Sequence, residues 1–231
     1  MRIGAHVSTS GGPSTAFDRS SAIGAEAVQI FGQSPHAWAF RYPAPDAIAA
    51  FRKRAQETGI APTFIHAIYL INLGTGDPAM LVKSVQTLQT TMKFAADIGA
   101  AGVVFHGGSH KGAGYEGIFR QTVDSLAKVL DASPPGPMLC IENSAGMGNH
   151  IGSKFGEIGR IIKAVGSTRL KVCLDTQHSF AAGYNLADPD GINAALLEFD
   201  QTIGLQHLAV VHANDSKTPL ASGVDRHANI G

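Results

Sequence analysis

The sequence has few cysteines and no excess charge of either sign. Its 231 residues include 2 cysteines, and Cys140 and Cys173 each lie in an apolar run. We expect two buried, reduced thiols in a cytoplasmic protein, because a disulfide framework needs more cysteines and an oxidising compartment. Basic and acidic residues number 18 each, so the formal net charge is zero. This balance argues against a uniformly positive surface that binds nucleic acid non-specifically. It does not exclude a local face that binds phosphate.

Long hydrophobic runs are also absent. No stretch of about 18 apolar residues occurs, so the sequence predicts no membrane span. The stretch MRIGAHVSTSGG lacks the apolar core of a signal peptide, and we therefore expect no export. Histidine, in contrast, occurs 10 times against 1 tryptophan. Histidine is therefore the residue type whose abundance most needs a functional explanation.

Short apolar runs alternate with segments of helical period. Seven runs are predicted to be strands: RIGAHVS, AVQIF, PTFIHA, VVFHGG, MLCIEN, KVCLDT and HLAVVHAND. Near-continuous apolar runs are typical of parallel strands that are buried on both faces. Three hydrophobic stripes predict core-facing helices: Leu81, Val85, Leu88, Met92 and Ala95; Phe119, Val123, Leu126 and Leu130; Phe155, Ile158, Ile162 and Val165.

This alternation predicts an α/β fold. With no repeat or linker, residues 1–231 are expected to form one domain. The leading candidate is a (β/α)8 TIM barrel, and a doubly wound open sheet is the alternative. Only seven strands and six intervening helices can be counted, so the barrel is expected to be truncated to about seven strands.

Metal-compatible residues gather at or beyond the predicted strand ends. They are His66, His106, Glu142, Asp175, His178, His212, Asp225 and His227. Because the carboxyl ends of barrel strands open on one face, these side chains should converge. Five histidines and three carboxylates exceed the needs of one tetrahedral ion and favour a cluster of two or three ions. Imidazole without thiolate favours zinc, with manganese or iron as alternatives.

Each of these residues alone has a plainer interpretation. A histidine at a strand end is more often a hydrogen-bonded core residue, and Glu142 could satisfy backbone amides. Asp225 and His227 are better candidates, because alternate residues of an extended segment point the same way. The metal site is predicted by the joint pattern, which places a metal-compatible residue at five of seven strand ends.

Six motifs carry a family resemblance over nearly the whole chain. They are IGAHVSTSGG, HAIYLINLG, FHGGSH, IENSAGMG, CLDTQHSFAAGY and VHANDSKTPLASGVDRHANIG. In this order they resemble endonuclease IV, the zinc-dependent family 2 of apurinic/apyrimidinic endonucleases. The resemblance implies a (β/α)8 barrel of the xylose isomerase-like type that acts in base excision repair. It implies hydrolysis of the phosphodiester 5′ to an abasic site in double-stranded DNA, leaving a 3′-hydroxyl and a 5′-deoxyribose phosphate.

The resemblance also implies the roles of the rim residues. It assigns three ligand sets: His66, His106 and Glu142 for one zinc; Glu142, Asp175 and His212 for a second; His178, Asp225 and His227 for a third. Glu142, Asp175 and His212 would be catalytic through the metal ions. Such ions neutralise the phosphodiester, lower the pKa of a bound water and stabilise the leaving alkoxide, so no protein nucleophile is needed.

The resemblance implies that loops at the rim of the barrel recognise DNA. In the family, loop side chains enter the minor groove while the abasic nucleotide flips outward, which is easiest where no base pair is broken. Trp38, Tyr69 and Leu70 occupy the matching positions, although the Tyr69 ring could instead cover the rim. Ser34 and His36 replace a polar Asn and Arg pair, and a histidine offers fewer fixed donors than an arginine. We therefore expect a weaker or reorganised grip on DNA.

The family continues past ANIG with an eighth strand, whose glutamate completes the second zinc site. We therefore expect eight of nine ligands and two unpaired strand edges. These edges invite self-association of a protein that is monomeric in the family. A fragment of an ordinary enzyme is the favoured explanation. The alternative is a shortened natural protein whose second zinc takes a water or a partner's carboxylate.

Two other functions stay open. A sugar isomerase or epimerase of the same barrel superfamily would use one metal ion, but the DRH segment and the YLINL loop argue against it. A protein that binds abasic DNA without cutting it is the second alternative.

Overall fold

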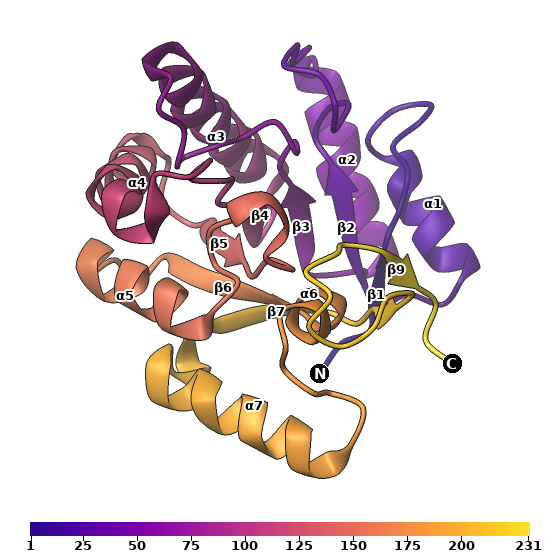
Figure 1. The fold of residues 1–231 in the computed structure, drawn as a ribbon. Coiled ribbons are helices and arrows are strands. Elements are labelled where there is room, and N and C mark those ends of the chain that lie inside the picture. The colour runs from indigo at the N-terminus through magenta and orange to yellow at the C-terminus, as the bar shows by residue number, and fades with distance from the viewer.

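The computed structural model describes residues 1–231, and its central feature is a parallel sheet that curls around an interior (Figure 1). Seven strands follow chain order: β1 (Gly4–His6), β2 (Ala27–Phe31), β3 (Thr63–His66), β4 (Gly102–His106), β5 (Met138–Glu142), β6 (Leu170–Asp175) and β7 (Leu208–His212). All six neighbouring pairs are parallel. The seven predicted strands and the α/β barrel architecture are confirmed.

The sheet is curled but not closed. β1 pairs only with β2, and β7 pairs only with β6. The outer side of β7 is open, and Val211 is 48% exposed. The prediction of a barrel truncated to seven strands is therefore confirmed.

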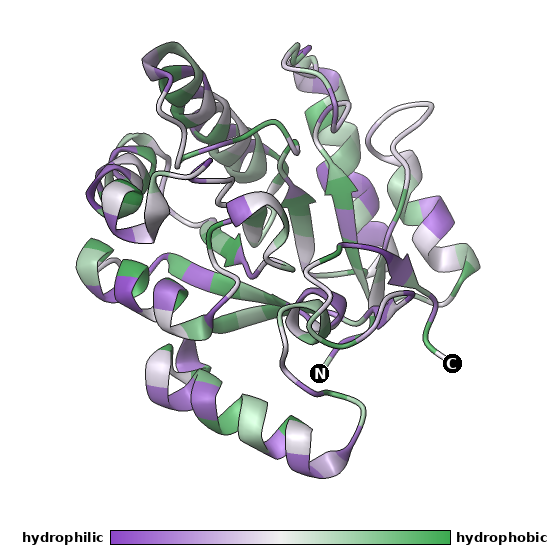
Figure 2. Ribbon diagram, in the orientation of Figure 1, coloured by the Kyte–Doolittle hydropathy of each residue, from purple (hydrophilic) through white to green (hydrophobic).

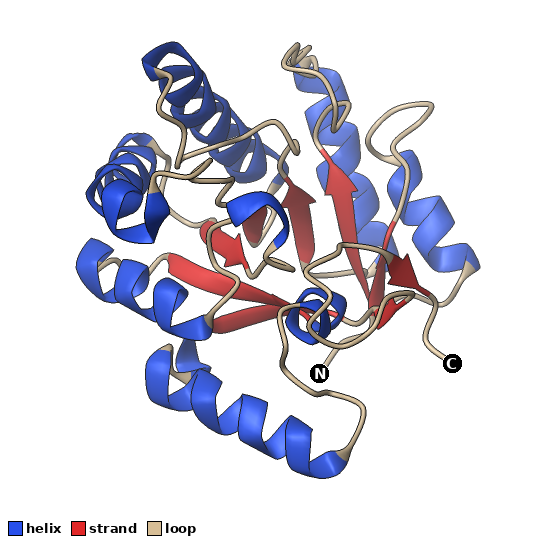
Figure 3. Ribbon diagram, viewed as in Figure 1, coloured by secondary structure: helices blue, strands red, loops and turns tan.

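Helices cover the outer face of the sheet (Figure 3). They are α1 (Thr15–Ala22), α2 (Pro45–Thr58), α3 (Pro78–Ile98), α4 (Gly114–Ala132), α5 (Phe155–Val165) and α7 (Pro189–Thr202). The short α6 (Thr176–Ala181) lies instead at the carboxyl end of β6, and two 3-10 turns, η1 (Met147–Asn149) and η2 (Leu205–His207), lie in connecting segments. Six of the seven α-helices are the expected connections between strands, and the short α6 was not expected. None of the helices combines the length and the hydrophobicity of a membrane span.

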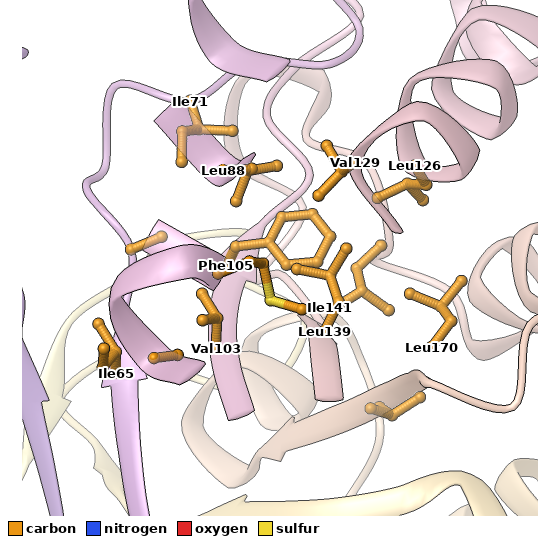
Figure 4. Packing of buried hydrophobic residues seen from close by; sticks show 14 of the residues in the cluster. Ile65, Ile71, Leu88, Val103, Phe105, Leu126, Val129, Leu139, Ile141 and Leu170 are labelled. Carbon is orange, nitrogen blue, oxygen red and sulfur yellow. The ribbon is translucent and has the colours of Figure 1, made fainter. Parts of the chain in front are cut away.

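Alternate strand residues point to opposite faces, and this period separates the core from the site. The strands are mainly hydrophobic, whereas β9 (His227–Ala228) is hydrophilic (Figure 2). The outward residues pack against α3 and α4 (Figure 4). The labelled residues of this core are Ile65, Ile71, Leu88, Val103, Phe105, Leu126, Val129, Leu139, Ile141 and Leu170.

The inward side has an apolar floor below an ionisable layer. Phe64, Val104, Cys140 and Cys173 form a separate buried cluster. Two residues further along each of these strands come, in the same order, His66, His106, Glu142 and Asp175. Both cysteines are buried and unpaired, as expected. Burial raises the pKa of Cys140 to about 12, so that thiol stays protonated.

Truncation of Phe105 tests the outer core. Its ring is 0% exposed in β4. Phe105→Ala is expected to lower the free energy of unfolding by about 3–5 kcal/mol, because it removes buried contacts and leaves a cavity. Val82→Ala is the control on α3, where Val82 is 54% exposed. Its expected cost is below about 0.5 kcal/mol. Urea unfolding measures both, and equal costs would contradict this assignment of the core.

Candidate metal centre

Glu142, the last residue of β5, lies in the middle of the candidate centre and is 2% exposed. Its Oε2 is 3.1 Å from Nε2 of His66 and 3.5 Å from Nε2 of His106. Its Oε1 is 3.0 Å from Nδ1 of His212. The ends of β3, β4, β5 and β7 therefore converge on one carboxylate. Each of its two oxygens faces a different set of imidazoles, which suits a bridging ligand.

The electrostatics of this group favour an ionised carboxylate. Burial opposes ionisation of Glu142, but His106, His212 and His66 outweigh it and hold the pKa well below 4.5. Burial also lowers the pKa of His106 to about 4. At neutral pH, Glu142 is therefore an anion and His106 a neutral imidazole. These are the protonation states in which both residues can bind a metal ion.

A second group of donors surrounds His212 at the end of β7. Donor atoms of Glu142, Cys173 and His212 lie within 4.8 Å of one another. Burial, then Glu142, raise the pKa of Cys173 well above 9, so its sulfur lacks the charge of a thiolate ligand. Oδ2 of Asp175 is 3.8 Å from Nδ1 of His212. Asp175 is therefore the better third donor, as the family resemblance implies.

A third group depends on the unexpected helix α6. Asp175 precedes α6, and its side chain accepts from the backbone N–H of His178 at 2.9 Å. This N-cap starts the helix directly at the end of β6 and turns His178 toward the rim. Nε2 of His178 is 3.3 Å from Oδ2 of Asp225 and 3.4 Å from Nε2 of His227. Oδ1 of Asp225 is 3.3 Å from Nε2 of His227.

The two imidazoles of this third group approach each other closely enough to share a proton or a bound cation. Nε2 atoms of two imidazoles that meet at 3.4 Å repel one another unless a proton or a cation lies between them. Burial opposes the charged form of His178, but Asp225 and Asp175 raise its pKa to about 9. Oδ2 of Asp175 is 3.8 Å from Nε2 of His227 as well as from His212, so this carboxylate faces both groups.

All eight rim residues therefore come together, and the donor set fits divalent metal ions. Three groups have donor atoms within 4.8 Å: His66, His106 and Glu142; Glu142, Cys173 and His212; Asp175, His178 and His227. The combination of imidazoles with buried carboxylates suits zinc and similar ions.

Several residues that hold the centre in place were missed by reasoning from the sequence. Asn143 accepts from the backbone N–H of Asp175 at 2.6 Å, and Asn214 donates to Oδ2 of Asp175 at 2.7 Å. Gln177 donates to the carbonyl of Val224, the residue before Asp225, at 3.1 Å. Asn143 directly follows a ligand candidate, and Gln177 lies between two of them, so adjacency was the available signal.

The three predicted DNA contacts have different positions. Tyr69 borders the centre and is 48% exposed, with its ring 5.5 Å from the His66 ring and 5.9 Å from the His106 ring. Burial, then Glu142 and Asp225, raise the pKa of Tyr69, so its phenol stays neutral. Trp38 and Leu70 are partly buried against the core instead. Lys83 lies over the Trp38 ring, with Nζ 4.8 Å from its centre.

Asn72 joins the loop that carries Tyr69 to the loop that follows His106. Its Oδ1 accepts from the backbone N–H groups of Gly74 and Ser109, both at 3.0 Å. Gly108 passes this side chain at φ 88°, where a Cβ would come 2.3 Å from Oδ1 of Asn72. Only glycine fits that approach and that backbone conformation.

Comparisons with known proteins agree with this geometry. A family model described as a xylose isomerase-like TIM barrel matches residues 17–231. A "Probable endonuclease 4" from Halothermothrix orenii is 40% identical, over 100% of this chain and 84% of the relative. The crystal structure of endonuclease IV from Thermus thermophilus is 36% identical and covers 99% of this chain and 81% of that one, with a TM-score of 0.88.

A more distant structural neighbour is a D-tagatose 3-epimerase-like protein. It is 17% identical, with a TM-score of 0.71 over 93% of this chain and 76% of the other, and so shares the fold alone. Since matches above 35% identity run the full length of the chain, the relationship to the nucleases is the specific one. The chain belongs to the endonuclease IV family of xylose isomerase-like TIM barrels.

Proposed function

We propose that the protein is a zinc-dependent endodeoxyribonuclease of base excision repair. It hydrolyses the phosphodiester 5′ to an abasic site in double-stranded DNA and leaves a 3′-hydroxyl and a 5′-deoxyribose phosphate. The observation that carries the proposal is the convergence of the eight rim residues in a member of the endonuclease IV family: seven belong to the three donor groups, and Asp225 lies beside His178 and His227.

The chain's own residues supply the binding geometry. His66, His106 and Glu142 would hold one ion; Glu142, Asp175 and His212 a second; His178, Asp225 and His227 a third. Bound ions supply positive charge to the phosphodiester and lower the pKa of a water. The protein holds Glu142 ionised between the first two donor groups and Asp175 between the second and third. With this arrangement no side chain has to act as a nucleophile.

Recognition of the lesion would involve the rim beside the first donor group. The Tyr69 ring is exposed there, and the His36 ring lies 5.4 Å from it. Ser34 and His36 are exposed, whereas Trp38 is partly buried on the core. We propose that Tyr69 and His36 form the contact surface and that Trp38 and Leu70 support the loops beneath it.

Incision of a duplex with one abasic site tests the proposal directly. The chain is expected to cut 5′ to the lesion, and a chelator should abolish cutting until zinc is restored. The assay is repeated with an eighth βα unit appended after Gly231, because β1 and β7 offer unpaired edges to such a unit. Cutting by neither chain would contradict the endonuclease function, and tight binding without cutting would indicate an abasic-site binder.

Replacement of Glu142 tests the centre without relying on activity. Glu142→Gln removes the shared charge, and zinc affinity is expected to fall by more than about 100-fold, beyond the effect of a residue that only touches a ligand. Competition with a chromophoric chelator measures the affinity and the number of ions. Asp215→Asn is the matched control, because Asp215 is exposed in β8 (Asp215–Ser216) outside the donor groups. One ion per chain would favour a sugar isomerase or epimerase.

Tyr69 is expected to affect DNA binding alone. Tyr69→Ala should weaken binding to abasic DNA about tenfold, which corresponds to about 1.4 kcal/mol for one aromatic contact. Tyr69→Phe keeps the ring and should bind as the unchanged protein does. Fluorescence anisotropy with an abasic duplex measures both. If Tyr69→Ala bound abasic DNA with unchanged affinity, the ring would only cover the rim and would not contact DNA.

A further inference from the structure

Two of the candidate ligand histidines have their second ring nitrogen bonded to a backbone carbonyl. Nδ1–H of His66 donates to the carbonyl of Ala67 at 2.7 Å, and Nδ1–H of His178 donates to the carbonyl of Asn143 at 2.9 Å. In the neutral form of each ring, this bond leaves Nε2 without a proton and directed at the donor groups. A histidine binds a metal ion through an unprotonated nitrogen, so an acceptor for the other nitrogen selects the competent tautomer.

In His212 the two ring nitrogens have exchanged roles, and the partner of the second nitrogen is a side chain. Its Nδ1 faces Oε1 of Glu142, and its Nε2 lies 3.0 Å from Oε1 of Gln29. Gln29 is in β2 and precedes His212 by 183 residues, and β2 and β7 are not neighbours in the sheet. Its side chain reaches His212 across the interior and is 9% exposed. A backbone carbonyl anchors His66 and His178, whereas this anchor can be removed by mutation.

The neutral His212 ring carries one proton, and two acceptors compete for it. A proton on Nδ1 would be donated to Glu142 and would block that nitrogen. A proton on Nε2 is donated to Gln29 and leaves the Nδ1 lone pair free. The orientation of the Gln29 amide is set by its own Nε2, which donates to Nδ1 of His6 at 3.1 Å. With Nδ1 of His6 unprotonated, this bond turns the amide oxygen of Gln29 toward His212.

We propose that Gln29 is a positioning residue that keeps the His212 proton on Nε2 and so frees Nδ1 for the second metal ion. His6 supports it by fixing the amide orientation. This role rests on the proposed function, because it presupposes that His212 binds an ion. Neither Gln29 nor His6 belongs to the three donor groups.

Chelator competition with zinc tests the role. In Gln29→Leu, which keeps a similar volume but has no acceptor, one bound ion is expected to be held about 10–100-fold more weakly, the range typical of residues that orient a ligand. Gln29→Glu keeps an oxygen opposite His212 and should restore the affinity. Gln33→Leu is the matched control, because Gln33 donates to the carbonyl of Ala37 and belongs to no donor group.

A second measurement separates this role from a general loss of structure. In the zinc-loaded protein, the Nε2 proton of His212 should give a resolved NMR signal that Gln29→Leu broadens through exchange with water. Equal zinc affinity in Gln29→Leu and in the unchanged protein would overturn the inference. Equal losses in Gln29→Leu and Gln29→Glu, with a lower free energy of unfolding in both metal-free variants, would also overturn it. If the unchanged protein bound no zinc, the proposed function itself would fail.

Discussion

One buried carboxylate organises the functional face of this protein. Glu142 is 2% exposed and lies within 3.5 Å of nitrogens from His66, His106, His178 and His212. A buried anion is costly unless cations or hydrogen-bond donors surround it. The strands that carry His66, His106 and His212 must therefore end at the same level, and α6 adds His178 there. That requirement is met by a parallel sheet, whose carboxyl ends all open on one face.

The strand period couples this centre to the stability of the fold. Outward residues such as Phe105 and Ile141 pack under the helices, while inward residues form an apolar floor with the ligand layer directly above it. The floor keeps water away from the lower side of the carboxylates, which strengthens each electrostatic interaction there. A shift of one residue in any strand would exchange the two faces and lose both the core and the ligand.

Beyond the strands, the centre depends on segments brought together from distant parts of the chain. Asn143 and Asn214 hold Asp175, and Gln177 holds the segment that carries Asp225. Asp175 has two roles: it caps α6, and it also faces both His212 and His227. Small polar groups thus fix the directions in which the ligands point. Metal sites in general depend on such neighbouring residues to orient their ligands.

The sequence by itself determined the seven strands, their parallel arrangement and the identity of the eight rim residues. Each follows from local features, namely apolar runs, helical stripes and the residue type at each strand end. The tertiary structure alone decided the position of Asp175 between two groups, the start of α6, and the reach of Gln29 to His212. It also showed Trp38 packed on the core beneath Lys83 while Tyr69 borders the centre. These features depend on distances between residues far apart in the chain, and local pattern carries no information about such distances.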